Sequence, residues 1–139
     1  MSVVYFDSSA LLSLVRDEPG SALLSALWNR ADALIASRLA DAEVRAVLRA
    51  GERTGRLSAA AAEHARTTWQ TMWPALRKVE VTAAIADHGA ALAEEHGLRA
   101  GDGLQLASVL LLAEAEPVVA VTDARLAEAA TGQGLRVLP

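Results

Sequence analysis

Short apolar runs alternate along the chain with longer stretches in which apolar residues recur at helical spacing. Apolar runs of three or four residues, partly β-branched, predict strands that are buried on both faces. These runs are Val3 to Phe6, Leu34 to Ala36, Val118 to Val121 and Leu135 to Leu138, with Val79 to Val81 as a fifth candidate. The Ala- and Leu-rich stretches between them predict seven helices. These are roughly Ser8 to Val15, Ser21 to Arg30, Arg38 to Thr54, Ser58 to Leu76, Ala83 to Glu95, Gly103 to Glu114 and Ala124 to Ala130.

Helix-breaking residues support these limits. Glu18-Pro19-Gly20 separates the first two helices, Gly51 and Gly55 close the third, and Gly97 follows the fifth. Strands that alternate with helices predict an α/β fold, in which one domain over residues 1–139 has a central, mostly parallel sheet of four to five strands. Helices should flank both faces of this sheet. Ligands bind such sheets at the edge where the carboxyl ends of the strands meet the following helices.

Composition narrows the class of protein. The chain has 139 residues, of which 53% are apolar and 22% charged, which suits one folded domain and excludes disorder. No apolar run approaches eighteen residues and the start has neither a basic segment nor a cleavage site, so we expect a cytoplasmic protein without a membrane segment. A net charge of −4 argues against a nonspecific polyanion binder. Because the chain has no cysteine, any metal must bind oxygen or imidazole.

Three aspartates lie where strands or buried helices meet this edge. Asp7 directly follows the first apolar run, and Asp123 follows the run that ends at Val121. Helix N-capping explains either residue alone about as well as ligand binding does. Asp102 is the only charge between Ala100 and Ala113, at the head of an almost wholly apolar helix, where capping competes with ligation again.

Glu43 lies inside a helix, where capping cannot explain it. The charged residues of this helix that share one arc of its surface are Arg38, Asp41, Arg45, Arg49 and Glu52. Glu43 falls outside the arc, so we expect its carboxylate to face the packed side of the helix. A buried carboxylate needs a cation or a proton, and a metal shared with the edge aspartates would supply the charge. Such a cluster is typical of Mg²⁺ or Mn²⁺ sites that activate water and stabilise a phosphodiester in transition.

Four segments of the chain together resemble the PIN domain. They are Val4-Tyr5-Phe6-Asp7-Ser8-Ser9-Ala10-Leu11-Leu12, the early part of the third helix with Glu43, Leu98-Arg99-Ala100-Gly101-Asp102-Gly103-Leu104-Gln105-Leu106-Ala107, and Val121-Thr122-Asp123-Ala124-Arg125-Leu126. The match runs nearly end to end. More narrowly, the chain resembles VapC-type toxins, the ribonuclease halves of bacterial toxin–antitoxin pairs.

The resemblance implies RNA cleavage that depends on Mg²⁺, with Mn²⁺ as a substitute. It implies that Asp7, Glu43, Asp102 and Asp123 are the catalytic and metal-binding residues. Ser9 matches the position whose hydroxyl supports the first aspartate or a metal-bound water. The implied partners are an RNA substrate, a second copy of the chain in a homodimer, and a VapB-type antitoxin.

Two features of the sequence depart from this pattern or allow two interpretations. Gly101 and Gly103 flank Asp102 where relatives carry larger residues, and glycines at a helix start should leave its carboxylate less well ordered. An aromatic stripe recurs at helical spacing from Trp69 to Leu76. Core packing is the favoured interpretation of this stripe, and a partner surface is the alternative, as it is for Trp28.

Other constellations fit the sequence less well. A haloacid-dehalogenase-type phosphatase needs a second aspartate at position 9, which is Ser, and a receiver domain needs a lysine after a late strand, whereas the only lysine is Lys78. The three histidines lack metal-ligand spacing, and no complete dinucleotide-binding or Walker motif is present. A metal-dependent endoribonuclease of a toxin–antitoxin pair is therefore the leading hypothesis. The alternatives are a PIN nuclease for RNA processing outside such pairs and a catalytically inert PIN-like binding module.

Overall fold

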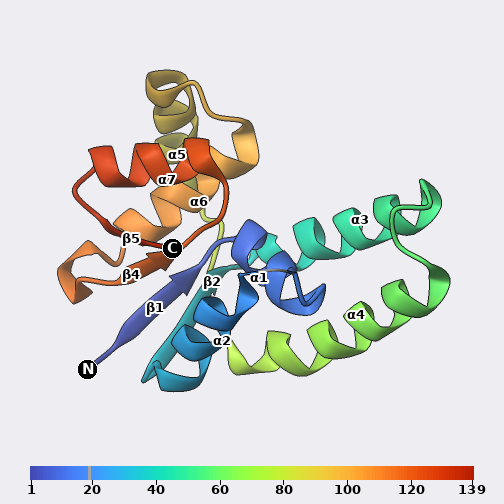
Figure 1. Ribbon diagram of the computed structural model, residues 1–139. Helices are drawn as coiled ribbons and strands as arrows, with labels where there is room; N and C mark the ends of the chain where they lie inside the picture. The colour runs from blue at the N-terminus through green and yellow to red at the C-terminus, as the bar shows by residue number, and fades with distance from the viewer. Residues whose placement is uncertain (19) are drawn as a thin grey trace.

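The first strand of the chain lies at the centre of a parallel sheet with the strand order β3-β2-β1-β4-β5 (Figure 1). In this computed structural model, which describes residues 1–18 and 20–139, the strands are β1 (Val3–Phe6), β2 (Ala33–Ser37), β3 (Arg77–Val79), β4 (Val118–Ala120) and β5 (Arg136–Leu138). All four neighbouring pairs are parallel, and Val4 of β1 lies opposite Leu34 on one side and Val118 on the other. The predicted α/β fold with a parallel sheet is confirmed.

In the described residues, 1–18 and 20–139, seven α-helices cover the two faces of this sheet. They are α1 (Ser8–Val15), α2 (Ser21–Arg30), α3 (Leu39–Arg53), α4 (Ala59–Met72), α5 (Ala83–His96), α6 (Ala100–Leu110) and α7 (Ala124–Gly132). Because successive side chains of a strand point to opposite faces, Val4 and Phe6 pack with α1 to α4, whereas Val3 and Tyr5 pack with α5 to α7. Figure 1 shows α5, α6 and α7 grouped on one side of β1 and α1 to α4 on the other.

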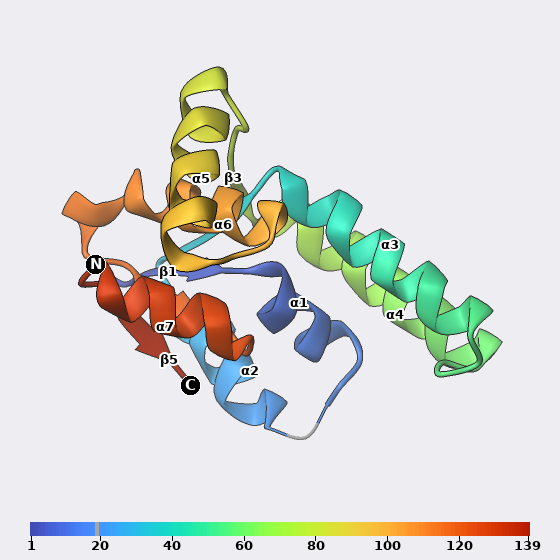
Figure 2. The same ribbon diagram turned by 90° about the horizontal axis from the view of Figure 1, so that it is seen from above.

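Helices α3 and α4 form an antiparallel pair that extends away from the sheet (Figures 1 and 2). Val44 and Leu48 of α3 are buried in the same cluster as Ala65 and Trp69 of α4. Ser58 caps α4 by accepting a hydrogen bond from the amide of Ala61. Since Glu43 is on α3, the packing of this pair sets where that carboxylate lies.

Two predicted elements are displaced along the sequence. β3 ends at Val79, where the predicted run begins, and β2 Ser37 lies opposite Val79. An edge strand needs only one buried face, so the apolar pattern misplaced it. Helix α6 begins three residues earlier than predicted and ends at Leu110, followed by a 3₁₀ turn at Ala113–Ala115. The apolar pattern continues past the true end of the helix, which is why it could not mark that end.

Two predicted helix limits also change. Gly51 was expected to close the third helix but lies within α3, and Thr54 and Gly55 follow the helix end instead. Helix α4 ends at Met72, where a 3₁₀ turn at Trp73–Ala75 replaces the rest of the predicted helix. Gly97 ends α5 with a left-handed backbone, as expected. In the predicted break before α2, Pro19 lies outside the described residues. No described helix combines the length and apolarity that a membrane span requires.

Candidate active site

Asp7 lies at the carboxyl end of β1 and is only 3% exposed. Its carboxylate caps α1, because Oδ1 accepts a hydrogen bond of 3.0 Å from the amide of Ala10. Asp7 also lines a cavity with the other predicted carboxylates, so its role as a helix cap does not exclude a role in ligand binding. Burial raises the pKa of Asp7 to about 7, against hydrogen bonds from Ser9 and Ala10 that lower it. No described residue forms an ion pair with it.

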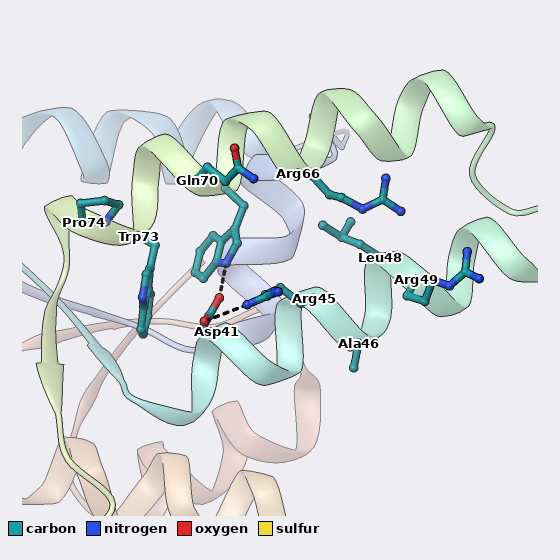
Figure 3. Close-up of a pocket in the computed structure, with 10 residues that line it drawn as sticks. Asp41, Arg45, Ala46, Leu48, Arg49, Arg66, Gln70, Trp73 and Pro74 are labelled. Carbon is teal, nitrogen blue, oxygen red and sulfur yellow. Dashed lines mark hydrogen bonds and ion pairs between the residues drawn. The ribbon is translucent and has the colours of Figure 1, made fainter.

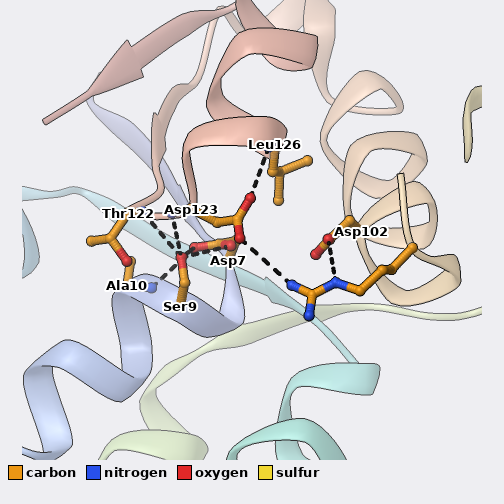
Figure 4. Close-up of polar contacts among 8 residues, drawn as sticks. Asp7, Ser9, Ala10, Asp102, Thr122, Asp123 and Leu126 are labelled. Carbon is orange, nitrogen blue, oxygen red and sulfur yellow. Dashed lines mark hydrogen bonds and ion pairs between the residues drawn. The ribbon is translucent and has the colours of Figure 1, made fainter. Parts of the chain in front are cut away.

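The hydroxyl of Ser9 links the residue that follows β1 to the loop that follows β4. It donates to the carboxylate of Asp7 at 2.7 Å and accepts from the amides of Thr122 at 3.0 Å and Asp123 at 3.3 Å (Figure 4). One hydroxyl thus holds the loop after β4 against the start of α1. This geometry sets the spacing between Asp7 and Asp123.

Asp102 and Asp123 lie on two different helix starts and share one arginine. Asp123 caps α7 by accepting from the amide of Leu126, while Asp102 lies in the first turn of α6, whose N-cap is Arg99. Capping, the competing interpretation for Asp102, therefore does not apply. The guanidinium of Arg99 lies 3.4 Å from Asp102 Oδ2 and 3.6 Å from Asp123 Oδ2. Burial raises the pKa of Asp102, and Arg99 opposes this rise.

Glu43 projects from α3 to meet α1 and α6. Its Oε1 accepts hydrogen bonds from the hydroxyl of Ser8 at 2.8 Å and from the amide nitrogen of Gln105 at 2.9 Å. The amide oxygen of Gln105 in turn accepts from the buried hydroxyl of Tyr5 at 2.5 Å. Burial raises the pKa of Tyr5 far above its usual range, so this hydroxyl remains a donor. The chain from Tyr5 through Gln105 orients one oxygen of Glu43.

This network corrects the expectation that only a cation or proton could stabilise Glu43. Two neutral donors, Ser8 and Gln105, contact its carboxylate. Glu43 is also half-buried rather than enclosed. The buried positions of α3 are Ala40, Val44 and Leu48. Its expected wheel neighbour Val47 is 38% exposed.

The two glycines beside Asp102 are places where other elements approach the start of α6 closely. A Cβ atom at position 101 would lie 2.8 Å from Oε2 of Glu43. A Cβ atom at position 103 would clash with the carbonyl oxygen of Gly89 on α5. The first glycine leaves room for a carboxylate, and the second allows α5 and α6 to pack backbone to backbone.

A cavity of about 480 Å³ brings the four predicted carboxylates together. Its lining includes Asp7, Ser9, Glu43, Asp102 and Asp123, with Ser8, Arg99 and Gln105 between them. The cavity lies where β1 and β4, adjacent strands whose connections run to opposite sides, reach their carboxyl ends. Within residues 1–18 and 20–139, no three acidic or imidazole side chains converge on one point as ligands of an ion.

A larger cavity, of about 650 Å³, lies between α3 and α4, on the side of α3 that carries Asp41 (Figure 3). Trp69 is buried and donates from its indole nitrogen to Asp41 at 2.9 Å, and its ring packs on Trp73. Core packing therefore explains most of the aromatic stripe, while Trp73 adds to the cavity wall. Trp28 packs on Phe6 and lines a smaller cavity with Leu14 and Met72.

Sequence reasoning missed the residues that hold Glu43. Gln105 follows Asp102 by three positions on the same helix and is the only strongly polar side chain of its apolar run, which is the signal that could have indicated it. Ser8 carried no such signal, because a serine at a helix start has an ordinary capping role.

The comparisons with known proteins agree with this architecture. The family model of the PIN domain matches residues 4–132. The chain belongs to the PIN domain family. It is 45% identical over 139 residues to Ribonuclease VapC45 of Mycobacterium tuberculosis, covering 100% of this chain and 96% of that one, which places it among VapC-type PIN domains.

Two solved structures share the fold of this PIN domain. FitAcB from Neisseria gonorrhoeae aligns with a TM-score of 0.68 and 19% identity, covering 99% of this chain and 97% of that one. A toxin–antitoxin complex from Klebsiella pneumoniae aligns with a TM-score of 0.61 and 18% identity, covering 86% of each chain.

Proposed function

We propose that this PIN domain is a ribonuclease that uses Mg²⁺ or Mn²⁺ and acts as the toxin of a toxin–antitoxin pair. The observation that carries the proposal is the single cavity lined by Asp7, Glu43, Asp102 and Asp123 at the carboxyl ends of β1 and β4. The relative at 45% identity is named a ribonuclease of the VapC type, which supports the same activity here.

The donor set fits a hard divalent cation. All four side chains offer carboxylate oxygens, the ligands that Mg²⁺ and Mn²⁺ prefer. Asp7 is a buried carboxylate with no ion pair among the described residues, so a bound cation would supply the positive charge that its surroundings lack. His96 pairs with Gln133, and His88 lines a different cavity, so neither adds an imidazole to this group.

When bound, such a cation activates water and neutralises charge that develops on the phosphate. The chain's own residues prepare the site for this step. Ser9 holds Asp7 and the Asp123 loop in register, and Gln105 with Ser8 orients Glu43. These hydrogen bonds fix the carboxylates before substrate arrives, so little reorganisation is needed during the reaction.

A cleavage assay on total RNA, with and without Mg²⁺ or Mn²⁺, tests the activity. We expect Asp7→Asn and Asp102→Asn to abolish cleavage and Asp123→Asn to reduce it less, while the exposed Asp87→Asn serves as a matched control with full activity. Full activity of Asp7→Asn or Asp102→Asn would contradict the site assignment. If the wild type cleaves RNA equally well in the presence of a chelator, the proposed metal dependence is contradicted.

Calorimetry identifies the metal. We expect Mn²⁺ and Mg²⁺ to bind more weakly as the pH falls, because protons compete for the carboxylates. His88→Ala and His96→Ala should leave this binding unchanged. Tight Zn²⁺ binding that depends on either histidine would contradict the proposed cation.

For partners, we propose a VapB-type antitoxin and a second copy of the chain. The Klebsiella structure is a toxin–antitoxin complex, and its shared fold supports an antitoxin partner for this chain. An apolar segment could pack at the Trp28 cavity and direct an arginine to the carboxylates. Expression of this protein alone should then stop growth, and its cognate partner should restore growth and weaken Mg²⁺ binding.

Harmless expression of the folded protein would contradict the toxin assignment. If the purified protein still cleaves RNA, that outcome favours RNA processing outside toxin–antitoxin pairs. If it neither cleaves RNA nor binds metal, the inert binding module is favoured. Sedimentation of the free protein as a monomer would contradict the homodimer.

A further inference from the structure

Arg99 is one of the residues that line the carboxylate cavity. It is the N-cap residue of α6, and its guanidinium reaches Asp102 through Nε and Asp123 through Nη2. The two aspartates belong to different helices, so this one side chain links the start of α6 to the start of α7. Among the described residues, Arg99 is the basic side chain that forms ion pairs with both Asp102 and Asp123.

The contacts of Arg99 are long and its side chain is exposed. Its two nitrogen–oxygen distances are 3.4 and 3.6 Å, whereas strong charge-assisted hydrogen bonds are about 2.7–2.9 Å long. The side chain is 79% exposed, while those of Asp102 and Asp123 are 16% and 29% exposed. A guanidinium held in this way is easily displaced, because water screens the pair and the long side chain gains freedom when it leaves.

Asp102 and Asp123 share the cavity with Asp7 and Glu43, so their negative charges repel one another. A divalent cation and the guanidinium would both neutralise this excess negative charge, and both would do so at the same carboxylate oxygens. They cannot both lie within contact distance of Asp102 Oδ2 and Asp123 Oδ2 without repelling each other. The bound cation carries twice the charge of the guanidinium, so the aspartates are not left unpaired when Arg99 leaves.

We propose that Arg99 is a displaceable counter-charge, which a divalent cation must move away from Asp102 and Asp123 in order to bind. The inference rests on the proposed metal dependence and adds a competitor within the chain itself. Metal affinity is then set partly by a residue that is not a ligand. After displacement the guanidinium stays tethered at the edge of the cavity, free for a phosphate group, which arginine binds well.

Titration of the purified protein with Mn²⁺ in a calorimeter tests this competition. We expect Arg99→Gln to bind Mn²⁺ roughly three- to fivefold more tightly than the wild type, the range expected for loss of one exposed ion-pair partner. Arg99→Lys keeps the positive charge and should stay closer to the wild type. Arg45→Gln is the matched control, since Arg45 is 71% exposed and pairs with Asp41 at 3.6 Å on another side of α3. Its affinity should change less than twofold.

A second readout separates competition from damage to the fold. Without metal, Arg99→Gln should unfold at a lower urea concentration than the wild type, and saturating Mn²⁺ should remove this difference. If the wild type binds Mn²⁺ and Arg99→Gln binds it equally or more weakly, the role of Arg99 is overturned but the metal proposal is not. Absence of Mn²⁺ binding in all four proteins would overturn the metal proposal and this inference with it.

Discussion

Gly101 of α6 lies against the carboxylate of Glu43, which belongs to α3. A Cβ atom on residue 101 would approach Oε2 of Glu43 to 2.8 Å, closer than side chains tolerate. The other oxygen, Oε1, is already held by Ser8 and Gln105. The missing side chain at position 101 therefore helps to decide where the free oxygen of Glu43 lies.

Gly101→Ala should weaken metal binding with little loss of stability. The atom that must move is the end of a flexible side chain, and alanine favours a helix over glycine by up to about 1 kcal/mol. Gly103→Ala is the contrasting variant, because its Cβ would meet the backbone of α5, and we expect a loss of about 1–3 kcal/mol. Urea denaturation and Mn²⁺ calorimetry of both variants distinguish the two effects. An unchanged Mn²⁺ affinity in Gly101→Ala would contradict the role of this glycine.

The stability of the metal-free protein should fall as the pH rises from about 4 to about 7. The pKa of Asp7 is about 7 in the folded chain and about 4 when unfolded, so in this window the folded chain binds more protons. The raised pKa of Asp102 acts in the same direction. Asp7→Asn should flatten the slope and stabilise the protein at pH 8 by a few kcal/mol, since each pKa unit corresponds to about 1.4 kcal/mol.

Urea denaturation in a chelator at several pH values measures this slope. Asp87→Asn controls for the loss of one exposed carboxylate and should keep the slope of the wild type. A steep slope that persists in Asp7→Asn would mean that another group is responsible. Added Mn²⁺ should stabilise the wild type more than the variant.

Ser9→Ala should loosen the loop after β4. The substitution removes the acceptor of two amides, those of Thr122 and Asp123, and a donor to Asp7. We expect a loss of about 1–2 kcal/mol in stability, a higher pKa for Asp7, and faster hydrogen exchange at the two amides. Ser13→Ala, on the same helix, should leave exchange at both amides unchanged, because its hydroxyl contacts neither.

Gln105→Leu should lower both stability and metal affinity. Leucine has a similar volume but leaves the buried hydroxyl of Tyr5 without its acceptor and Glu43 without one donor. We expect a loss of about 1–3 kcal/mol, the usual effect of leaving a buried polar group unpaired. The exposed Gln70→Leu provides the control. Wild-type Mn²⁺ affinity in Gln105→Leu would contradict the view that Gln105 orients Glu43.

The sequence was most informative where one local rule decides the position of a residue. Asp7 and Asp123 each follow a buried strand, so parallel pairing alone places them at one edge of the sheet. Glu43 was separated from its charged neighbours by helical periodicity. In each case the signal lies within a few residues of the side chain that it concerns.

Contacts between distant elements were beyond this kind of reasoning. The hydrogen bonds of Glu43 depend on how α1, α3 and α6 pack, which no single segment encodes. The position of Arg99 depends on the distance between the starts of α6 and α7. The edge strand β3 contains Arg77 and Lys78, and its pairing with β2 overrode the apolar pattern.

The placement of β1 between β2 and β4 also has a consequence during protein synthesis. Asp7 and Glu43 leave the ribosome early, but Asp102 and Asp123 come from the last third of the chain. A growing chain therefore has an open sheet edge beside β1 and only half of the carboxylates. For the proposed ribonuclease, the four carboxylates are therefore brought together only when the last elements of the domain have been made.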